Sequence, residues 1–166
     1  MLIRPALADD AAEIHAVVAA AFGQTPEGHR GEADLVDALR ADGDIAIELV
    51  AEDEGFIIGH LLFSPLSTDT GQRLAALAPL SVLPERQKEG VGTLLMQVGH
   101  ELCRKAGVEA VIVLGHPDYY PRVGYSAEAA LQVKAPFSGP HFMALALTDG
   151  VLEAPVTITY AKAFGL

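Results

Sequence analysis

The stretch Pro79-Leu-Ser-Val-Leu-Pro-Glu-Arg-Gln-Lys-Glu-Gly90-Val-Gly-Thr93 joins an apolar strand pattern to an amphipathic helix through a short polar loop. The loop ends in two glycines, Gly90 and Gly92, which turn tightly and let a ligand approach the backbone because they lack a Cβ. Several backbone N–H groups then point outward at the positive end of the helix dipole. We therefore expect this loop to bind an anionic group such as a phosphate.

Two common phosphate-binding motifs do not fit this loop. The nucleoside-triphosphate loop requires Gly-x-x-x-x-Gly-Lys-Ser/Thr, which is absent, and the dinucleotide fingerprint requires a third glycine where Leu95 stands. What remains is the pattern Gln87-x-x-Gly90-x-Gly92. About one helix and one strand further on comes a second element, Tyr120-Pro-Arg-Val-Gly124-Tyr125.

Together these two elements resemble the GCN5-related N-acetyltransferases, in the branch of bacterial predicted acetyltransferases. That family carries Gln/Arg-x-x-Gly-x-Gly/Ala between a central strand and a helix, and a Tyr-x-x-x-Gly-Phe/Tyr signature later in the chain. The resemblance extends over most of the chain and is weakest after about residue 126. It implies an α/β (α+β) fold in one N-acetyltransferase domain over residues 1–166, with a mixed sheet of about seven strands, about four flanking helices and a strand wedge for acetyl-CoA.

Hydrophobic periodicity predicts alternating helices and strands along the chain. Asp9 or Asp10 is expected to cap a first helix that ends at Gly23. Pro79 lies inside a strand pattern and indicates an edge or a bulge, because proline lacks the N–H that a strand needs. The further helices are expected over Glu32–Arg40 and Gly90–Lys105. The strands are expected over Leu2–Arg4, Ile45–Glu52, Phe56–Ser64, Leu74–Leu83, Ala110–Leu114, Leu131–Ala135, Phe142–Leu147 and Pro155–Ala161.

Composition excludes several classes of function. The 166-residue chain is 51% hydrophobic, enough for a full core in one domain. It shows neither a signal-type segment nor an apolar run that could span a bilayer, so we expect a cytoplasmic protein with no membrane partner. The formal net charge of −11 disfavours nucleic acid and favours the approach of a cationic amine.

The resemblance implies that acetyl-CoA is the acyl donor and lies along the strand and the loop. The exposed backbone of Leu80, Ser81 and Val82 would align the pantetheine arm like an added strand, with an N–H near Val82 polarising the thioester carbonyl. The pyrophosphate would be held by the N–H groups of Gln87, Lys88, Glu89, Gly90, Val91, Gly92 and Thr93. Arg86, Lys88 and Arg122 flank the two motifs and either contact phosphates or are solvated surface charges.

Tyr120 is the candidate general acid, because it matches the family's tyrosine four residues before the glycine. A phenol with a pKa of about 10 can give a proton to the departing thiolate. Tyr119 is the alternative acid and a candidate cofactor contact. The other interpretation of Tyr120 is structural, as part of a small aromatic cluster with Tyr119 and Tyr125. In the family the amine attacks the thioester directly, without an acyl-enzyme.

Two further side chains are candidates for the site. Glu32 begins the helix that borders the acceptor pocket in this family, where it would hold the amine or relay its proton; alternatively it only favours the helix dipole. His116 follows a buried strand and would contact the cofactor or act as a base, although a histidine at a strand end requires no such role. Many family members carry an asparagine near this strand end, where this chain has Val113, Leu114 and Gly115.

A metal site and a covalent intermediate are not expected. The histidines show no ligand-like spacing and no Cys/His cluster exists in the sequence. The single cysteine, Cys103, cannot form an internal disulfide and is interpreted as a packed thiol rather than a nucleophile.

The sequence therefore predicts acetyl-CoA-dependent transfer of an acetyl group, by direct attack, to a primary amine of a small molecule or peptide. Two alternatives stay open: a non-catalytic acyl-CoA-binding module, and an accessory interaction subunit that works through an apolar patch. The apolar-rich segment after Phe137 could supply such a patch or mediate a homodimer. The connector Gln24–Arg30 and the loop Phe137–His141 are expected to shape the acceptor pocket. The negative charge hints at polyamine, aminoglycoside or lysine-like acceptors.

Overall fold

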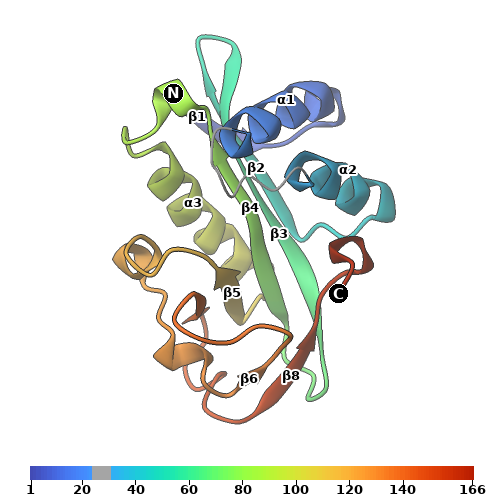
Figure 1. Cartoon of the computed structure of the whole chain (residues 1–166), viewed down its shortest axis with the longest axis vertical. Helices are drawn as coiled ribbons and strands as arrows, with labels where there is room; N and C mark the ends of the chain where they lie inside the picture. Colours follow the sequence, from blue (N-terminus) through green and yellow to red (C-terminus); the bar gives the residue numbers. More distant parts are fainter. Residues whose placement is uncertain (24–30) are drawn as a thin grey trace.

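The fold is built on a mixed sheet in the computed structural model, which describes residues 1–23 and 31–166. The strand order is β1-β2-β3-β4-β5-β7, and β8 pairs with both β3 and β6 (Figure 1). The pairs β4–β5 and β6–β8 are parallel and the others are antiparallel. The strands are β1 (Leu2–Pro5), β2 (Ile47–Asp53), β3 (Phe56–Thr68), β4 (Leu74–Val82), β5 (Ala110–Leu114), β6 (Val133–Lys134), β7 (Phe142–Ala146) and β8 (Val156–Thr159). The α-helices are α1 (Ala11–Phe22), α2 (Glu32–Asp42) and α3 (Val91–Lys105).

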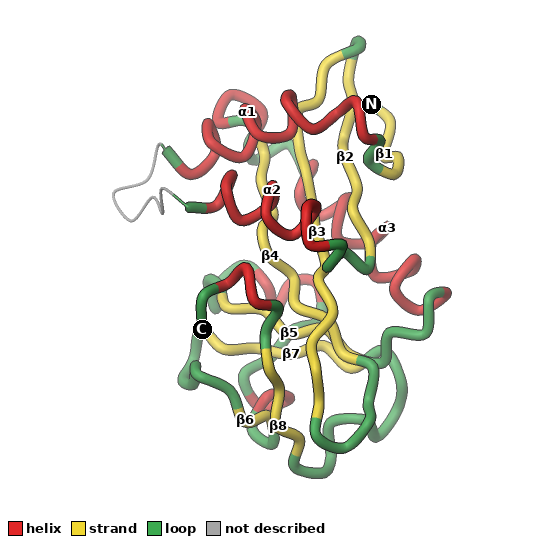
Figure 2. Tube along the Cα trace, turned by 90° about the vertical axis from the view of Figure 1, so that its right-hand side faces the viewer, coloured by secondary structure: helices red, strands yellow, loops and turns green. Residues whose placement is uncertain are grey.

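Helices cover both faces of the upper part of the sheet. Figure 2 shows α1 and α2 in front of the strands and α3 behind them. The alternation of side chains along β2 explains this layering, because successive residues of a strand point to opposite faces. Val50 packs in the core beneath α1 and α2, whereas Leu49 packs in the core beneath α3. A third apolar core lies among β5, β7 and β8 in the other half of the molecule.

Glycine brings α3 close to the sheet. A Cβ added to Gly99 would lie 2.6 Å from a ring carbon of Phe63 and 2.9 Å from a methyl carbon of Leu61, both on β3. No side chain at residue 99 would fit without moving these groups. The close packing sets the position of the whole helix, including its N-terminus.

The strands β4 and β5 separate partway along their length. Their parallel pairing covers Leu74–Ala76 and ends there. On the other side of β4, Leu61 pairs with Leu80 while Phe63 pairs with Leu77, so Ala78 and Pro79 form a bulge. The bulge predicted from Pro79 is confirmed. Beyond Ala76, β4 pairs only with β3 among the described residues, and a wedge opens on its free side.

The observed elements match the expected ones with limited differences. The described residues hold eight strands and three α-helices, against about seven and about four expected. The described residues also form short 3-10 turns, such as Tyr120–Val123 and Lys162–Phe164. The strand expected over Leu131–Ala135 is shortened to β6, and β3 extends to Thr68 because it pairs there with β8. The connector Gln24–Arg30 lies outside the described residues.

The predicted cap of α1 is wrong in its contacts, although Asp10 does precede the helix. The carboxylate of Asp10 accepts hydrogen bonds from Arg4 Nη1 at 2.7 Å and from the Leu7 N–H at 2.7 Å, and no side chain caps the helix. Hydrogen bonds with Arg4 lower the pKa of Asp10.

Within residues 1–23 and 31–166, none of the helices α1, α2 and α3 is long and apolar enough to cross a membrane.

Candidate active site

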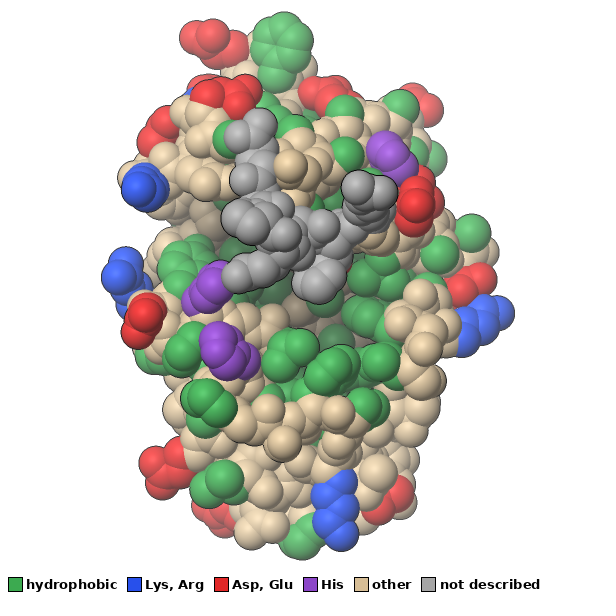
Figure 3. Space-filling view, viewed as in Figure 1, with side chains coloured by type: hydrophobic (Ala, Val, Ile, Leu, Met, Phe, Trp, Pro, Cys, Tyr) green, Lys and Arg blue, Asp and Glu red, His purple; other side chains and the backbone are tan. Residues whose placement is uncertain are grey.

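A cleft of about 500 Å³ opens where β4 and β5 diverge. Figure 3 shows a hollow across the middle of this face, with hydrophobic side chains gathered around it. Its lining comes from β4 and β5, from the ends of α1 and α2, and from the C-terminal segment that packs beside α2. The described lining residues are Phe22, Glu32, Leu35, Ala76, Leu77, Ala78, Pro79, Leu80, Ile112, Leu114, Gly115, His116, Tyr120, Phe137, Tyr160 and Phe164.

The loop before α3 has the backbone geometry of an anion site. Lys88 and Gly90 have φ angles of 66° and 85°, so two left-handed residues alternate in the turn that leads into the helix. The first helical hydrogen bond runs from the Leu94 N–H to the Gly90 carbonyl at 3.0 Å, and no side chain caps the helix. The N–H groups of the first turn therefore have no acceptor from a cap and lie at the positive end of the helix dipole.

The two glycines of the motif serve different purposes. A Cβ on Gly90 would meet nothing within 4 Å, so glycine is favoured there by its positive φ rather than by space. A Cβ on Gly92 would lie 2.8 Å from the hydroxyl oxygen of Tyr119, and 3.6 and 3.8 Å from side-chain carbons of Leu80 and Val82. Gly92 thus lets the helix start, the strand end and Tyr119 meet at one point.

The strand predicted to align the cofactor lies beside this loop. Leu80, Ser81 and Val82 pair with β3 on one side and have no strand neighbour on the other among the described residues. Gln87 Nε2 donates a hydrogen bond to the Val82 carbonyl at 3.2 Å and ties the loop to the end of the strand. The Ser81 side chain is buried, and its hydroxyl has no partner within the described part of the chain.

The basic residues near the loop are not equivalent. Arg86 forms ion pairs with Asp53 at 2.9 Å and with Glu89 at 3.1 Å, and its hydrogen bond lowers the pKa of Asp53. Its guanidinium therefore holds the loop against the β2–β3 hairpin. Lys88 and Arg122 are exposed and form no ion pair with any residue in 1–23 or 31–166.

Tyr120 belongs both to the cleft and to an aromatic cluster. Its ring centroid lies 5.1 Å from that of Tyr119 and 5.6 Å from that of Tyr125, in edge-to-face contacts. The Tyr120 ring also covers Gly115, where an added Cβ would collide with it. The backbone carbonyl of His116 accepts the N–H groups of Tyr119 and Tyr120 and shapes the turn. Burial raises the pKa of the Tyr120 phenol well above its ordinary value, with a smaller contribution from Tyr119.

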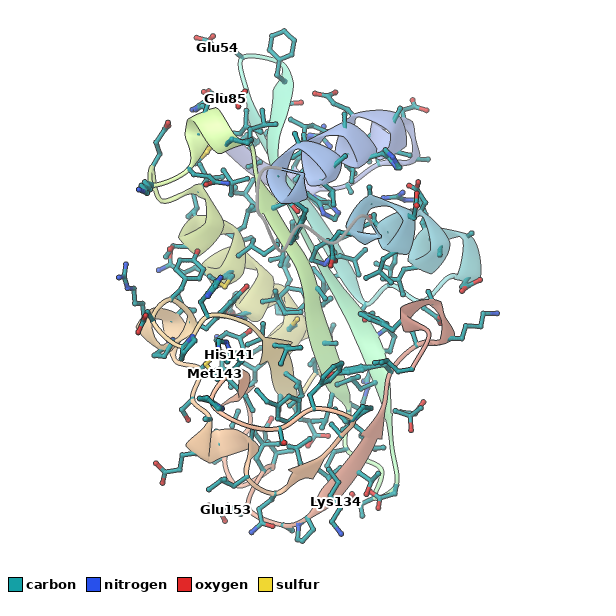
Figure 4. The ribbon with its side chains drawn as sticks, viewed as in Figure 1. Glu54, Glu85, Lys134, His141, Met143 and Glu153 are labelled. Carbon is teal, nitrogen blue, oxygen red and sulfur yellow. The ribbon has the colours of Figure 1, made fainter. Side chains whose placement is uncertain are left out.

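The structure brings Glu32 and His116 to the same cleft as Tyr120. Glu32 is half-buried at the first position of α2, and His116 is exposed just after β5. The His116 ring lies 6.4 Å from the ring of His141, whose Nδ1 is 3.1 Å from the Gly115 carbonyl oxygen. Figure 4 labels His141 beside the end of β5, outside the lining. Of the predicted loop Phe137–His141, only Phe137 lines the cleft.

Sequence reasoning missed part of the cleft wall. Phe22, Leu35, Tyr160 and Phe164 come from helix ends and from the C-terminus, far apart in the sequence. Their apolar character was visible as helical spacing and as an apolar C-terminal segment. No local pattern showed that they face a common space.

Two groups lie away from the cleft. Cys103 is buried in the core beneath α3, and burial raises its pKa to about 12. His15, Asp34 and Asp37 bring their ligand atoms within 4.8 Å of one another on the α1–α2 surface, a grouping that spacing within one helix does not reveal. There His15 Nδ1 and an Asp37 oxygen are 2.7 Å apart, and Arg40 lies 3.7 Å from the same carboxylate.

Residues 2–127 match the family model of the acetyltransferase (GNAT) domain. The chain is 37% identical to YjhQ of Escherichia coli K12, named an uncharacterized N-acetyltransferase, over 90% of this chain and 84% of that protein. A GNAT family acetyltransferase from Brucella melitensis, solved with acetyl-CoA, is 34% identical, with a TM-score of 0.83 over 98% of this chain and 97% of that one. The E. coli N-acetyltransferase YhbS, solved with CoA, is 30% identical, with a TM-score of 0.87 over 99% of this chain and 92% of that one. A matching domain, related sequences and a shared fold agree, and the chain belongs to the GNAT acetyltransferase family.

Proposed function

We propose that this protein transfers an acetyl group from acetyl-CoA directly to a primary amine. The observation that carries the proposal is the wedge between β4 and β5, which joins the uncapped start of α3 to the cleft at Tyr120. Support also comes from the Brucella melitensis and YhbS structures, which hold acetyl-CoA and CoA on the same fold.

The donor would bind along the open side of β4. The backbone of Leu80–Val82 would pair with the pantetheine arm, and an N–H near Val82 would polarise the thioester carbonyl. The N–H groups from Gln87 to Thr93 would receive the pyrophosphate at the start of α3. Tyr119 stands against Gly92 at the junction of strand and loop. His116 lines the same cleft and would contact the cofactor.

The proposed acetyl transfer requires only two side chains, Tyr120 and Glu32, besides the donor and the amine. The neutral amine nitrogen attacks the thioester carbon, the C–S bond breaks, and the CoA sulfur takes a proton from the Tyr120 hydroxyl. Burial raises the pKa of Tyr120, so the phenol carries its proton at neutral pH. Glu32 would hold the incoming amine or accept its proton through water. Holding donor and amine together in the cleft supplies much of the rate.

Acetyl-CoA binding, measured by calorimetry, tests the donor site directly. Gly90→Glu places a negative charge at the start of α3 and should weaken acetyl-CoA binding at least about tenfold through repulsion of the pyrophosphate. Gly71→Glu is the matched control, since the φ angles are 85° and 87° and both added Cβ atoms would meet open space. Equal affinities for the two variants would place the donor elsewhere.

Transfer itself is measured by release of the CoA thiol in the presence of primary amines. Acetyl-CoA binding without release in the presence of any amine would instead identify a binding module. If the parent protein does not bind acetyl-CoA, the proposed function is wrong.

A further inference from the structure

The described side chains that line the cleft are mostly apolar. Among the lining residues that the structure describes, Glu32 carries the only carboxylate and His116 the only imidazole. The others are aliphatic, aromatic or glycine. We propose that the acceptor is a small primary amine with one positive charge, carried on an aromatic or branched aliphatic body. This inference rests on the proposed acetyl transfer and names its substrate class.

One wall of the cleft is a row of aromatic rings from the C-terminal segment, in edge-to-face and tilted contacts. The ring centroids of Phe137 and Tyr160 are 5.7 Å apart, and those of Tyr160 and Phe164 are 5.2 Å apart. Burial raises the pKa of Tyr160 to about 12, so this phenol is uncharged at physiological pH. All three rings follow residue 127, where the match to the family model ends.

The helix ends beside this wall are apolar as well, since Phe22, Leu35 and Phe164 pack against the same buried cluster. Phe22 at the end of α1 and Leu35 on α2 face the cleft, and Pro79 and Leu114 contribute from the sheet. An aromatic or branched body entering this space would contact apolar groups on several sides. Its removal from water would favour binding, and ring-to-ring contacts would add to that gain.

The acidic residues that give the chain its net charge of −11 lie mostly elsewhere. Asp34 and Asp37 are exposed on the outer side of α2. Figure 4 places Glu54 and Glu85 at one end of the molecule and Glu153 at the other. A second or third ammonium inside the cleft would lose its water without a carboxylate from the described lining, which is costly. Polyamines and aminoglycosides are therefore poor candidates.

The size of the cleft agrees with a small ligand. Its volume of about 500 Å³, which the acetyl end of the donor would share, lies within the range of roughly 300–1,000 Å³ that small-molecule pockets occupy. The combination of volume, aromatic wall and one acidic residue in the described lining favours one ring or one branched chain beside the amine.

A series of amines tests the inference on the full-length protein. Thiol release would be measured for ethylamine, butylamine, hexylamine, 3-methylbutylamine and 2-phenylethylamine, with spermidine, kanamycin and lysine for comparison. Each added methylene that enters the cleft should raise kcat/KM about fourfold. 2-Phenylethylamine should exceed spermidine at least about tenfold.

Variants of the aromatic wall connect the preference to the cleft. Phe164→Ala and Phe137→Ala should each lower kcat/KM for 2-phenylethylamine at least about tenfold, with acetyl-CoA affinity unchanged. Phe164→Leu is the milder change if the alanine variant does not fold. Leu131→Ala is the matched control, because Leu131 is 79% exposed in the same segment and outside the lining.

The outcomes separate this inference from the proposed function. Efficient acetylation of spermidine, kanamycin or lysine, with no gain along the alkyl series, would overturn the substrate class and keep the acetyltransferase. Wall variants that affect every amine equally would also overturn it. Acetyl-CoA binding without acetylation of any amine would contradict the proposed function, and the inference would fail with it.

Discussion

The Tyr120 ring lies directly over Gly115, so close that a Cβ at residue 115 would stand 2.8 Å from one ring carbon and 3.2 Å from another. Gly115→Ala should push the ring out of place, destabilise the fold by about 1–3 kcal/mol and lower kcat. Urea unfolding and thiol release measure the two effects. In a Tyr120→Ala background the collision is gone, and Gly115→Ala should then cost little stability. Additive losses would show that the two residues do not interact.

The two neighbouring tyrosines should have different effects when their hydroxyls are removed. Tyr120→Phe removes the proposed acid and should lower kcat at least about 100-fold, with folding and acetyl-CoA affinity preserved. Tyr119→Phe removes a hydroxyl that faces the start of α3 and should mainly raise the KM for acetyl-CoA. Steady-state kinetics on both variants distinguish the roles. The reverse pattern would make Tyr119 the acid.

The pair His100 and Tyr125 predicts a loss of stability in mild acid. Their Nε2 and hydroxyl oxygen are 2.7 Å apart, and burial lowers the pKa of His100 from 6.5 to about 4. Between these two values the unfolded chain binds a proton that the folded protein does not, so the free energy of unfolding falls as the pH drops. The loss from this histidine between pH 7 and pH 4 should reach about 3 kcal/mol.

Urea unfolding at pH 7, 5.5 and 4.5 measures this slope, with His100→Gln as the comparison. The variant lacks a titrating group at this position and should show a flatter profile. Arg4 lowers the pKa of Asp10 below 3.8, so the stability that this carboxylate adds is lost mainly below about pH 4 and changes little over the range measured. Parallel profiles for parent and variant would contradict the assignment to His100.

Cys103 should behave as an inert core thiol. It is fully buried, and burial raises its pKa to about 12, so little thiolate is present at neutral pH. A thiol reagent should react with it slowly in the native protein and rapidly in urea. Cys103→Ala should cost about 1–2 kcal/mol of stability and leave kcat nearly unchanged. Abolished transfer in a folded variant would indicate a covalent route through sulfur.

Replacing Gly99 with alanine has two opposing effects on stability, a gain from helix preference and a cost from overpacking. Alanine is favoured over glycine inside a helix by about 1 kcal/mol, but its Cβ would lie 2.6 Å from the Phe63 ring. Overpacking costs about 1–3 kcal/mol and should win, so Gly99→Ala should lower the free energy of unfolding. In a Phe63→Ala background the same change should cost less stability, because the ring is gone and only the Leu61 methyl carbon, at 2.9 Å, still crowds the added Cβ.

Local patterns were sufficient for most of the fold. Alternating and helical spacing placed the strands and α-helices within a few residues, and β5 has the expected bounds of Ala110–Leu114. Pro79 correctly indicated the bulge of β4. These features depend on neighbouring residues, which a sequence displays directly. The pairing of β8 with β3 and β6 depends on long-range contacts, and no local pattern predicted it.

The candidate site likewise has a part that local sequence predicted and a part that depends on long-range contacts. The loop from Gln87 to Thr93 was visible because its glycines and helix start are contiguous. From its position Arg86 was expected to be either a phosphate contact or a solvated surface charge, yet it pairs with Asp53 on the β2–β3 hairpin. The aromatic wall was equally hidden, because Phe137, Tyr160 and Phe164 meet only in three dimensions.

The aromatic wall also has an evolutionary consequence. The proposed donor loop lies inside the stretch that matches the family, and Phe137, Tyr160 and Phe164 follow it. On the proposed assignment, substitutions in the last part of the chain would alter which amine is accepted without touching the groups proposed to hold acetyl-CoA. Related proteins could keep the same acyl donor while their acceptor amines change, and their sequences should then diverge first in the C-terminal segment.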